Sequence, residues 1–178
     1  MNNSKNPFSL EGKVIVVTGG TGVLGQSFVK AISEAGGKVA ILGRKGDVAK
    51  ARAEEINKNG GEAIGVVCDV MSEESLIAAK DEILKAFGKI DGLVNGAGGN
   101  MPGAVVEPDA DIFDLNISAL RQVLDLNLFG SLIPTQIFGK EIAKTGNGVI
   151  VNISSMSSQR IITKVLGYSM AKTAIDSY

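Results

Sequence analysis

The stretch VTGGTGVLG, residues 17–25, constrains the fold of this chain more than any other segment. It ends a short run rich in β-branched residues (13–19), which is typical of a strand, and opens a segment with helical apolar spacing (23–35). Its glycines fit G-x-G-x-x-G, which permits a tight turn and lets the backbone approach a pyrophosphate closely. The free N–H groups of a helix start attract phosphate. We therefore predict a dinucleotide site at this turn, the alternative being a glycine-rich turn without a ligand.

Strand-like and helix-like segments alternate along the whole chain. This alternation predicts parallel βαβ units with right-handed crossovers. The expected fold class is α/β, a three-layer doubly wound parallel sheet (Rossmann fold) with strand order 3-2-1-4-5 and a ligand at the carboxyl ends of the strands. Residues 96–114 read as a loop, and Pro134 is expected to kink the fourth helix. The predicted strands are 13–19, 38–43, 62–68, 91–95 and 148–153, and the predicted helices are 23–35, 47–58, 72–87, 118–143 and one beginning at 167.

The composition argues against several classes of function. The 178 residues include no histidine, which removes Ser-His-Asp and Cys-His catalysis and the usual zinc sites, so no metal is expected. Cys68 is the only cysteine and is expected to be a buried apolar residue. A net charge of −1 and 4% aromatic residues give no case for binding nucleic acid or a membrane. With no secretory signal and no apolar run of about 18 residues, the predicted location is the cytoplasm.

The end of the second predicted strand bears on the choice of cofactor. Proteins that bind NAD usually place an acid there for the ribose 2′-hydroxyl. This chain instead has Arg44 and Lys45 after Gly43, and a guanidinium is a good bidentate partner for phosphate. We therefore predict NADP(H) in preference to NAD(H), although a solvated charge pair would give the same pattern. Asp69, after the third strand, is placed either to meet the adenine or to cap the next helix.

Tyr168 and Lys172 lie four residues apart on the last predicted helix and therefore share a face. A free tyrosine titrates near pH 10 and is a poor acid–base catalyst at neutral pH. An ammonium at ~5 Å, at an effective dielectric constant of ~20, stabilises a phenolate by roughly 3 kcal/mol. The pair can then move a proton on and off a carbonyl oxygen while a hydride moves at carbon. An exposed helix face is the ordinary alternative for this spacing.

The surroundings of this pair resemble the short-chain dehydrogenase/reductase family. The matching pieces cover essentially the whole chain in family order: TGGTGVLG, Asp69-Val70, LVNGAGG (93–99), Asn127, NISS (152–155) and Tyr168-x-x-x-Lys172. The resemblance implies that Tyr168 is the catalytic acid/base and that Lys172 supports it and holds the ribose. It also implies that Ser155, rather than Ser154, orients the substrate carbonyl and that Asn127 positions a water for a proton relay. Taken together, the glycine turn, the end of the second strand and the resemblance predict a cofactor cradle of Gly19, Gly20, Thr21, Gly22, Val23, Leu24, Gly25, Arg44, Lys45, Asp69, Val70, Asn95, Gly96, Ala97, Gly98, Tyr168 and Lys172.

Two departures from the family pattern bear on the subclass. The usual NNAG reads NGAG, and the glycine spacing 19-22-25 is that of the extended members, which include epimerases and dehydratases. The LVNGAGG segment and the thirteen-residue interval from Ser155 to Tyr168 favour the ordinary dehydrogenase type. A narrower similarity, through NGAGGNMP, PTQIF and ISSMSSQRIITKVLGYSMAK, is to the mannonate/fructuronate oxidoreductase subgroup. Arg160 and Lys164 would then face the substrate carboxylate, unless they belong to a solvated basic loop.

The expected function is therefore NADP(H)- or NAD(H)-dependent interconversion of a carbonyl and a secondary alcohol on a small molecule, a sugar acid or polyol. Two alternatives stay open: a non-catalytic cofactor-binding or assembly module, and an epimerase of the extended type. The chain reads as one NAD(P)-binding Rossmann domain over residues 1–178. The resemblance implies that the fold continues past Tyr178 with two more strands and a substrate-covering segment, so that the chain is truncated within the catalytic helix. It also implies a homodimer or homotetramer.

Overall fold

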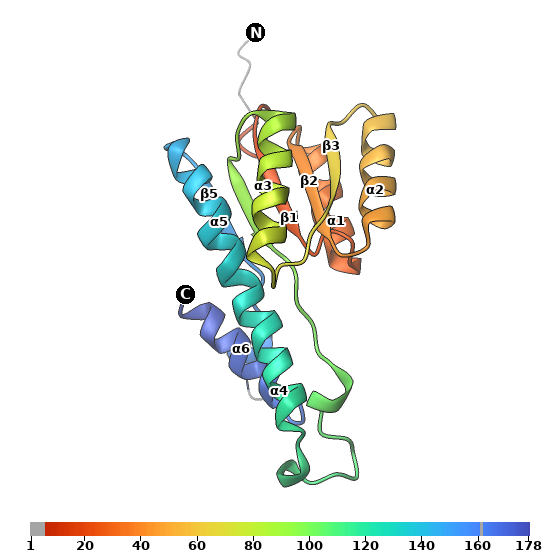
Figure 1. The fold of residues 1–178 in the computed structure, drawn as a ribbon, viewed down its shortest axis with the longest axis vertical. Coiled ribbons are helices and arrows are strands. Elements are labelled where there is room, and N and C mark those ends of the chain that lie inside the picture. The colour runs from red at the N-terminus through yellow and green to blue at the C-terminus, as the bar shows by residue number, and fades with distance from the viewer. Residues whose placement is uncertain (1–5, 161) are drawn as a thin grey trace.

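A parallel five-stranded sheet forms the centre of the molecule (Figure 1). The computed structural model describes residues 6–160 and 162–178. The strands lie in the order β3-β2-β1-β4-β5, so the predicted α/β fold and strand order are confirmed. In the register of the sheet, Val16 of β1 lies opposite Ala40 of β2 and Leu93 of β4. The strands are β1 (Val14–Thr18), β2 (Lys38–Gly43), β3 (Ala63–Val67), β4 (Gly92–Asn95) and β5 (Val149–Asn152).

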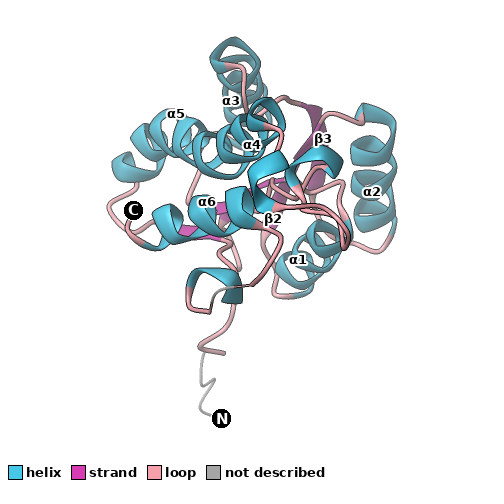
Figure 2. Ribbon diagram, turned by 90° about the horizontal axis from the view of Figure 1, so that it is seen from below, coloured by secondary structure: helices cyan, strands magenta, loops and turns pink. Residues whose placement is uncertain are grey.

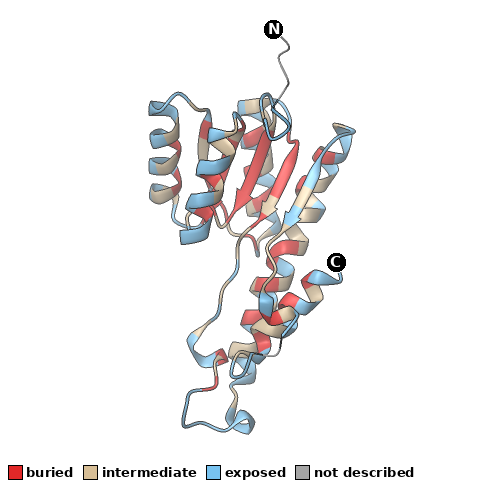
Figure 3. Cartoon of the chain, turned by 180° about the vertical axis from the view of Figure 1, so that it is seen from behind, coloured by how far each residue is buried: buried red, intermediate tan, exposed pale blue. Residues whose placement is uncertain are grey.

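Helices cover both faces of this sheet, as Figure 2 shows from one end. Helices α1 (Val23–Glu34) and α2 (Gly46–Lys58) pack on one face, and α3 (Glu73–Phe87) and α5 (Gly130–Lys144) pack on the other. Alternate residues of β1 serve the two cores: Val16 packs toward α3 and α5, whereas Val17 packs toward α1 and α2. Figure 3 shows the buried residues concentrated on the central strands. Every residue of β1 is buried, which explains its unbroken apolar sequence.

The connecting elements after β4 extend beyond the carboxyl edge of the sheet (Figure 1). Two single 3₁₀ turns, Pro102–Ala104 and Ile112–Asp114, interrupt the long loop, and a third, Met156–Ser158, follows β5. Helices α4 (Ile117–Leu124) and α6 (Leu166–Asp176) pack against each other there. Within the part of the chain that the structure describes, no helix is long and apolar enough to cross a membrane.

The predicted helix 118–143 is not continuous. α4 ends at Leu124, a π-helical turn spans Asp125–Phe129, and α5 then begins at Gly130. Pro134 lies inside α5, where its ring crowds the carbonyl four residues earlier and it donates no hydrogen bond. That carbonyl belongs to Gly130, the residue at which the π turn meets α5. The irregularity was expected at Pro134, but the π-helical turn lies one helical turn earlier. This π-helical turn contains Asn127, which is fully buried.

Asp91 lies just before β4, and its buried carboxylate bonds to the start of β1 at the amino-terminal end of the strands. It is 4% exposed and accepts hydrogen bonds from the Val14 backbone N–H at 2.9 Å and from Lys89. Lys13 Nζ forms an ion pair with Asp91 Oδ1 at 3.5 Å. Burial alone raises the pKa of this carboxyl. The bonds from Lys89 and Val14 and the two lysine charges outweigh burial and hold the Asp91 pKa below its usual range.

We expect Asp91→Asn to lower the free energy of unfolding at pH 7 by about 1–3 kcal/mol, because it removes charge-assisted bonds to a buried acceptor. The native pKa is below the unfolded value of about 3.9, so this stabilisation is complete above that value and disappears as the pH falls through the native pKa. Urea unfolding at successively lower pH should show a constant difference between the two proteins above about pH 4 and a shrinking difference below it. Asp81→Asn, at an exposed carboxylate of α3, is the control; a pH-independent difference for Asp91→Asn would contradict the assignment.

Candidate cofactor and catalytic site

The turn between β1 and α1 can be made only with glycine at its first position. Gly19 has φ +65°, and a Cβ built there would lie 2.6 Å from the Gly96 carbonyl oxygen and 2.7 Å from the Ala97 nitrogen. The Gly22 N–H closes the turn by donating to the Gly19 carbonyl at 2.9 Å. A Cβ at Gly25 would collide with that same carbonyl. Gly19 thus lets the turn pack against the segment after β4, and Gly25 lets α1 pack against the turn.

Thr18, the last residue of β1, ties these two segments together. Its side chain is fully buried, and its Oγ1 accepts hydrogen bonds from the Gly96 and Ala97 N–H groups at 3.2 and 3.3 Å. Sequence reasoning did not single out this residue. Its position in the sequence could have indicated this role. Thr18 carries a hydroxyl at the carboxyl end of a buried strand, directly before the glycines, and a second Gly-rich turn follows the neighbouring strand β4.

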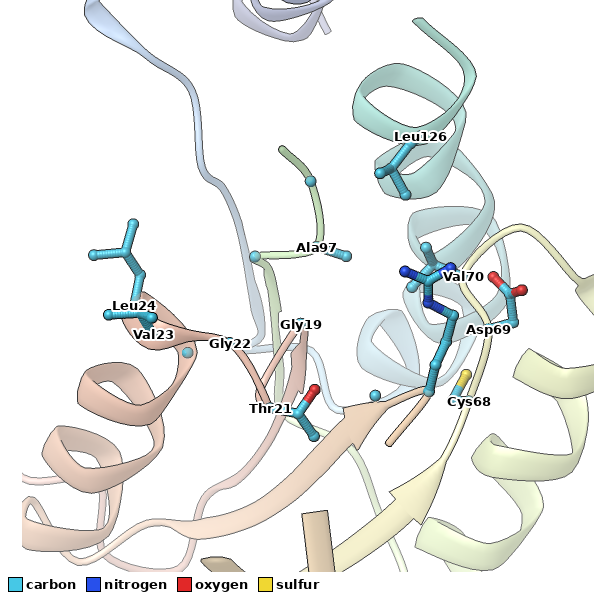
Figure 4. A pocket seen from close by; sticks show the side chains of 15 residues that line it. Gly19, Thr21, Gly22, Val23, Leu24, Cys68, Asp69, Val70, Ala97 and Leu126 are labelled. Atoms are coloured by element: carbon cyan, nitrogen blue, oxygen red, sulfur yellow. The ribbon is translucent and has the colours of Figure 1, made fainter. Parts of the chain in front are cut away.

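A cavity of about 390 Å³ opens at this edge of the sheet, above the carboxyl ends of the strands (Figure 4). The first turn of α1 faces it; the N-cap residue Gly22 has no side chain, so no side-chain cap engages the free N–H groups. Val23 and Leu24 are 88% and 65% exposed at its mouth. The lining residues are Gly19, Thr21, Gly22, Val23, Leu24, Gly25, Gly43, Arg44, Cys68, Asp69, Val70, Gly96, Ala97, Gly98 and Leu126.

Most of the predicted cradle lines this cavity, and five predicted residues do not. Those five are Gly20, Lys45, Asn95, Tyr168 and Lys172. Three lining residues were not predicted: Gly43, Cys68 and Leu126. The first two lie at the ends of β2 and β3, where the rule that ligands bind at carboxyl ends of strands could have found them. Leu126 belongs to the π turn, which no sequence pattern marked.

Asn95 is engaged elsewhere. Its side chain is 1% exposed, and its Nδ2 donates to Thr135 Oγ1 of α5 at 2.9 Å and to Asn152 Oδ1 of β5 at 2.8 Å. The residue therefore joins β4 to its neighbouring strand and helix. Within the described residues its buried Oδ1 has no hydrogen-bond partner.

Arg44 and Asp69 line the same end of the cavity from neighbouring strands. Arg44 follows β2 and is exposed, and the described residues include no ion-pair partner for it. Asp69 follows β3; its Oδ1 accepts from the Met71 N–H at 3.0 Å, and its N–H donates to Ser75 Oγ at 3.0 Å. The carboxylate thus supports the turn before α3 from within the cavity lining. Helix α3 itself is capped by Ser72, whose Oγ accepts from the Ser75 N–H.

The buried Asn127 side chain clamps the segment after β4. Its Nδ2 donates to the carbonyls of Gly99 at 2.7 Å and Val123 at 2.9 Å, while its Oδ1 accepts from the Gly99 N–H at 3.0 Å. Both amide hydrogens are therefore used within the protein. The role in a water relay stays a prediction, and in this arrangement a water would have to bind at Oδ1 or at the backbone of the π turn.

Lys172 lies at the end of β5, beside Tyr168. It is 4% exposed; its Nζ donates to the Ile153 carbonyl at 2.7 Å and lies 5.6 Å from the centre of the Tyr168 ring. Burial lowers the pKa of Lys172, and the charge of Asp176 opposes that shift only in part. The tyrosine is half-buried. When charged, an ammonium held in this place puts a positive charge beside the ring of a phenol.

Ser155 enters the same region from β5. Its backbone is extended, and its Oγ accepts from the Ser157 N–H at 3.2 Å at the start of the turn Met156–Ser158. That turn packs against α6, the helix of Tyr168 and Lys172. The fold thus brings the segments that carry Ser155, Tyr168 and Lys172 together at the end of β5.

The two basic residues predicted to meet a substrate lie apart from the cavity lining. Arg160 and Lys164 are both exposed. Lys164 has φ +73°, and its carbonyl accepts from the Val106 N–H at 2.9 Å, which links this loop to the one after β4. Their role toward a substrate carboxylate stays a prediction.

Comparison with known proteins places this architecture in a family. The family model described as short chain dehydrogenase matches residues 13–178, and the chain belongs to that family. An uncharacterized oxidoreductase, UxuB, of Bacillus subtilis (strain 168) is 39% identical over 178 residues, which is 96% of this chain and 64% of the relative. The chain thus spans slightly less than two thirds of the length of that protein.

Two solved structures are also similar. A proposed D-mannonate oxidoreductase from Haemophilus influenza, with bound NAD, superposes with a TM-score of 0.87 at 37% identity, over 95% of this chain and 64% of that one. A 7α-hydroxysteroid dehydrogenase, complexed with NADH and 7-oxo glycochenodeoxycholic acid, has a TM-score of 0.86 at 31% identity, over 99% of this chain and 66% of that one.

Proposed function

We propose that this chain is the cofactor-binding and catalytic part of an oxidoreductase that interconverts a carbonyl and a secondary alcohol with a nicotinamide dinucleotide. One observation carries the proposal: a buried lysine lies beside a tyrosine at the same sheet edge as a glycine cradle. A lysine is rarely buried at a cost in desolvation unless its charge is used. Membership of the short chain dehydrogenase family supports the same reading.

The cavity fits a dinucleotide on the geometry of its own residues. The space that a Cβ at Gly19 or Gly25 would fill is occupied by backbone, which shapes the turn, and the open first turn of α1 suits a pyrophosphate. Arg44 and Asp69 would hold the adenosine end, and residues 96–98 the other. When bound, the nicotinamide supplies or accepts the hydride. The related structures with NAD or NADH support this choice of cofactor class.

The chain's own side chains would handle the proton. Tyr168 gives its phenolic proton to the carbonyl oxygen in reduction and takes a proton from the alcohol in oxidation. Lys172 stabilises the phenolate through its charge, and Ser155 orients the reacting oxygen with its hydroxyl. Asn127 keeps the segment after β4 in place by holding both backbone groups of Gly99.

We further propose that the preferred cofactor is NADP(H). Arg44 is exposed in the lining at the end of β2, and the carboxylate in that part of the lining, Asp69, follows a different strand. A guanidinium at this place offers paired donors to a 2′-phosphate. The related structures hold NAD or NADH, so the preference for NADP(H) is proposed on Arg44 alone.

We expect Arg44→Ala to raise the Kd for NADPH by about 10- to 100-fold, since one charge-assisted contact of about 1.5–3 kcal/mol is lost. The Kd for NADH should change by less than about threefold, because no phosphate is present there. Titration of nicotinamide fluorescence measures both. Lys58→Ala removes an exposed cation at the far end of α2 and serves as the control. An equal loss for NADPH and NADH would refute the proposed 2′-phosphate contact.

The substrate we propose is a sugar acid or polyol. The support is the likeness to the proposed D-mannonate oxidoreductase, together with two cations, Arg160 and Lys164, in the loop before α6. The test is turnover by the protein as its native source makes it, with keto-uronates, polyols and hydroxysteroids offered in parallel. Cofactor binding without turnover of any substrate would favour a binding module instead. Nicotinamide absorbance that copurifies with the protein would favour an epimerase.

A further inference from the structure

The glycine turn has a second face, and one side chain from a different helix occupies it. Arg52, on α2, donates through Nη1 to the Gly20 carbonyl at 2.5 Å and to the Gly22 carbonyl at 2.9 Å. Its Nη2 reaches the Gln26 Oε1 of α1 at 3.4 Å. Neither Arg52 nor Gly20 lines the cavity. The guanidinium therefore holds the turn from behind, while the front of the turn faces the proposed ligand.

The contact uses the specific chemistry of arginine. One nitrogen, Nη1, carries two hydrogens and donates to both carbonyls, while the planar guanidinium directs its second nitrogen, Nη2, to Gln26 of α1. Arg52 is half-buried, and the ion pairs recorded for the described residues do not include it. Its charge is therefore applied to the carbonyl dipoles of the turn rather than to a carboxylate. Charge-assisted bonds of this kind are about twice as strong as neutral ones.

The turn is the segment that most needs such a brace. Four of the seven residues 19–25 are glycine, and glycine loses more conformational freedom on ordering than any other residue. A ligand that had to order a loose turn would bind more weakly by that cost. A brace from α2 orders the turn beforehand and keeps the first N–H groups of α1 aimed at the cavity.

We propose that Arg52 is a positioning residue for the dinucleotide: it sets the glycine turn through the Gly20 and Gly22 carbonyls without touching the ligand. The inference rests on the proposed function, because it concerns the same cofactor site. It adds a residue that the glycine motif does not contain, and it couples α2 to the pyrophosphate end of the cavity.

The test compares Arg52→Gln and Arg52→Lys with Lys50→Gln, which removes an exposed charge from the same helix. NADH and NADPH affinities are measured by fluorescence titration, and hydrogen exchange of the 18–26 segment is measured without and with saturating dinucleotide. For Arg52→Gln we expect about tenfold weaker binding of both dinucleotides and faster exchange in the free protein, restored on saturation. Arg52→Lys keeps the positive charge but lacks the second nitrogen that reaches Gln26, so it should give an intermediate loss of affinity. If Arg52→Gln does not fold, Arg52→Lys provides the comparison with the unaltered chain. Lys50→Gln should match the unaltered chain.

The outcomes separate this inference from the function on which it rests. If the unaltered chain binds neither dinucleotide, the proposed function falls, and the inference falls with it. If the chain binds but Arg52→Gln binds equally well, only the inference is overturned. Weaker binding with unchanged exchange of the turn would mean that Arg52 contacts the ligand directly, which also overturns a positioning role. A loss confined to NADPH would do the same, because a brace on the turn cannot distinguish a 2′-phosphate.

Discussion

Gly19→Ala is expected to abolish dinucleotide binding and to destabilise the fold by about 3 kcal/mol or more. Two independent costs add. The residue adopts φ +65°, where an L side chain costs roughly 1–2 kcal/mol. The new Cβ would also lie 2.6–2.7 Å from backbone atoms of Gly96 and Ala97, and backbone cannot rotate away as a side chain does. Relief would require the turn after β1 and the segment after β4 to separate, which opens the cradle.

Gly12 is a control that separates the backbone strain from the collision with the segment after β4. Gly12 has φ +73°, and a Cβ there meets nothing within 4 Å. Gly12→Ala should therefore show the backbone strain alone, a loss of about 1–2 kcal/mol with unchanged cofactor affinity. Chemical unfolding and fluorescence titration of both variants give the comparison. Equal effects at the two positions would mean that the close approach of the two turns does not matter for the site.

The strand-and-helix alternation predicted a parallel doubly wound sheet, because right-handed crossovers leave few arrangements, and the common dinucleotide-binding arrangement supplied the strand order. The two-sided burial of β1 followed from its unbroken apolar run. The sequence did not show which helices Asn95 would meet, because β4 is apolar on both faces and could turn either face to them. Side chains alternate between faces along a strand, and Leu93 packs toward α3 and α5, so residue 95 must point to that same face. Its bond to Thr135 of α5 is what this periodicity requires.

Other parts of the site had no local signal. The π turn at Asp125–Phe129 adds one residue to a helical turn, and a helical pattern of apolar residues continues through it without a visible break. Arg52 reads in the sequence as one more charge on a charged surface helix, and its partners lie 30 and 32 residues away along the chain. Such contacts depend on how α2 crosses the end of the glycine turn. Local propensity does not encode that geometry, which tertiary packing decides.

Tyr168→Phe is expected to lower kcat by about 10³-fold, the middle of the range attributed to a general acid–base group. Phenylalanine keeps the ring that lies 5.6 Å from Lys172 Nζ, so packing in α6 should be preserved. Only the phenolic oxygen is lost, which is the group that we propose carries the proton. The substitution removes a single hydroxyl and leaves the cradle residues 19–25 and 96–98 unchanged, so dinucleotide affinity should stay within about threefold. Turnover and fluorescence titration on the same preparation separate the two effects.

The chain contains one other tyrosine, Tyr178, which is 49% exposed, and Tyr178→Phe is the matched control. It should keep full turnover and full cofactor affinity. Parallel loss of turnover and of binding in Tyr168→Phe would place the tyrosine in cofactor binding rather than in proton transfer. Retained turnover would remove the acid–base role altogether. Lys172, buried and bonded to the Ile153 carbonyl, would then keep only the ribose-holding role that the family resemblance implies.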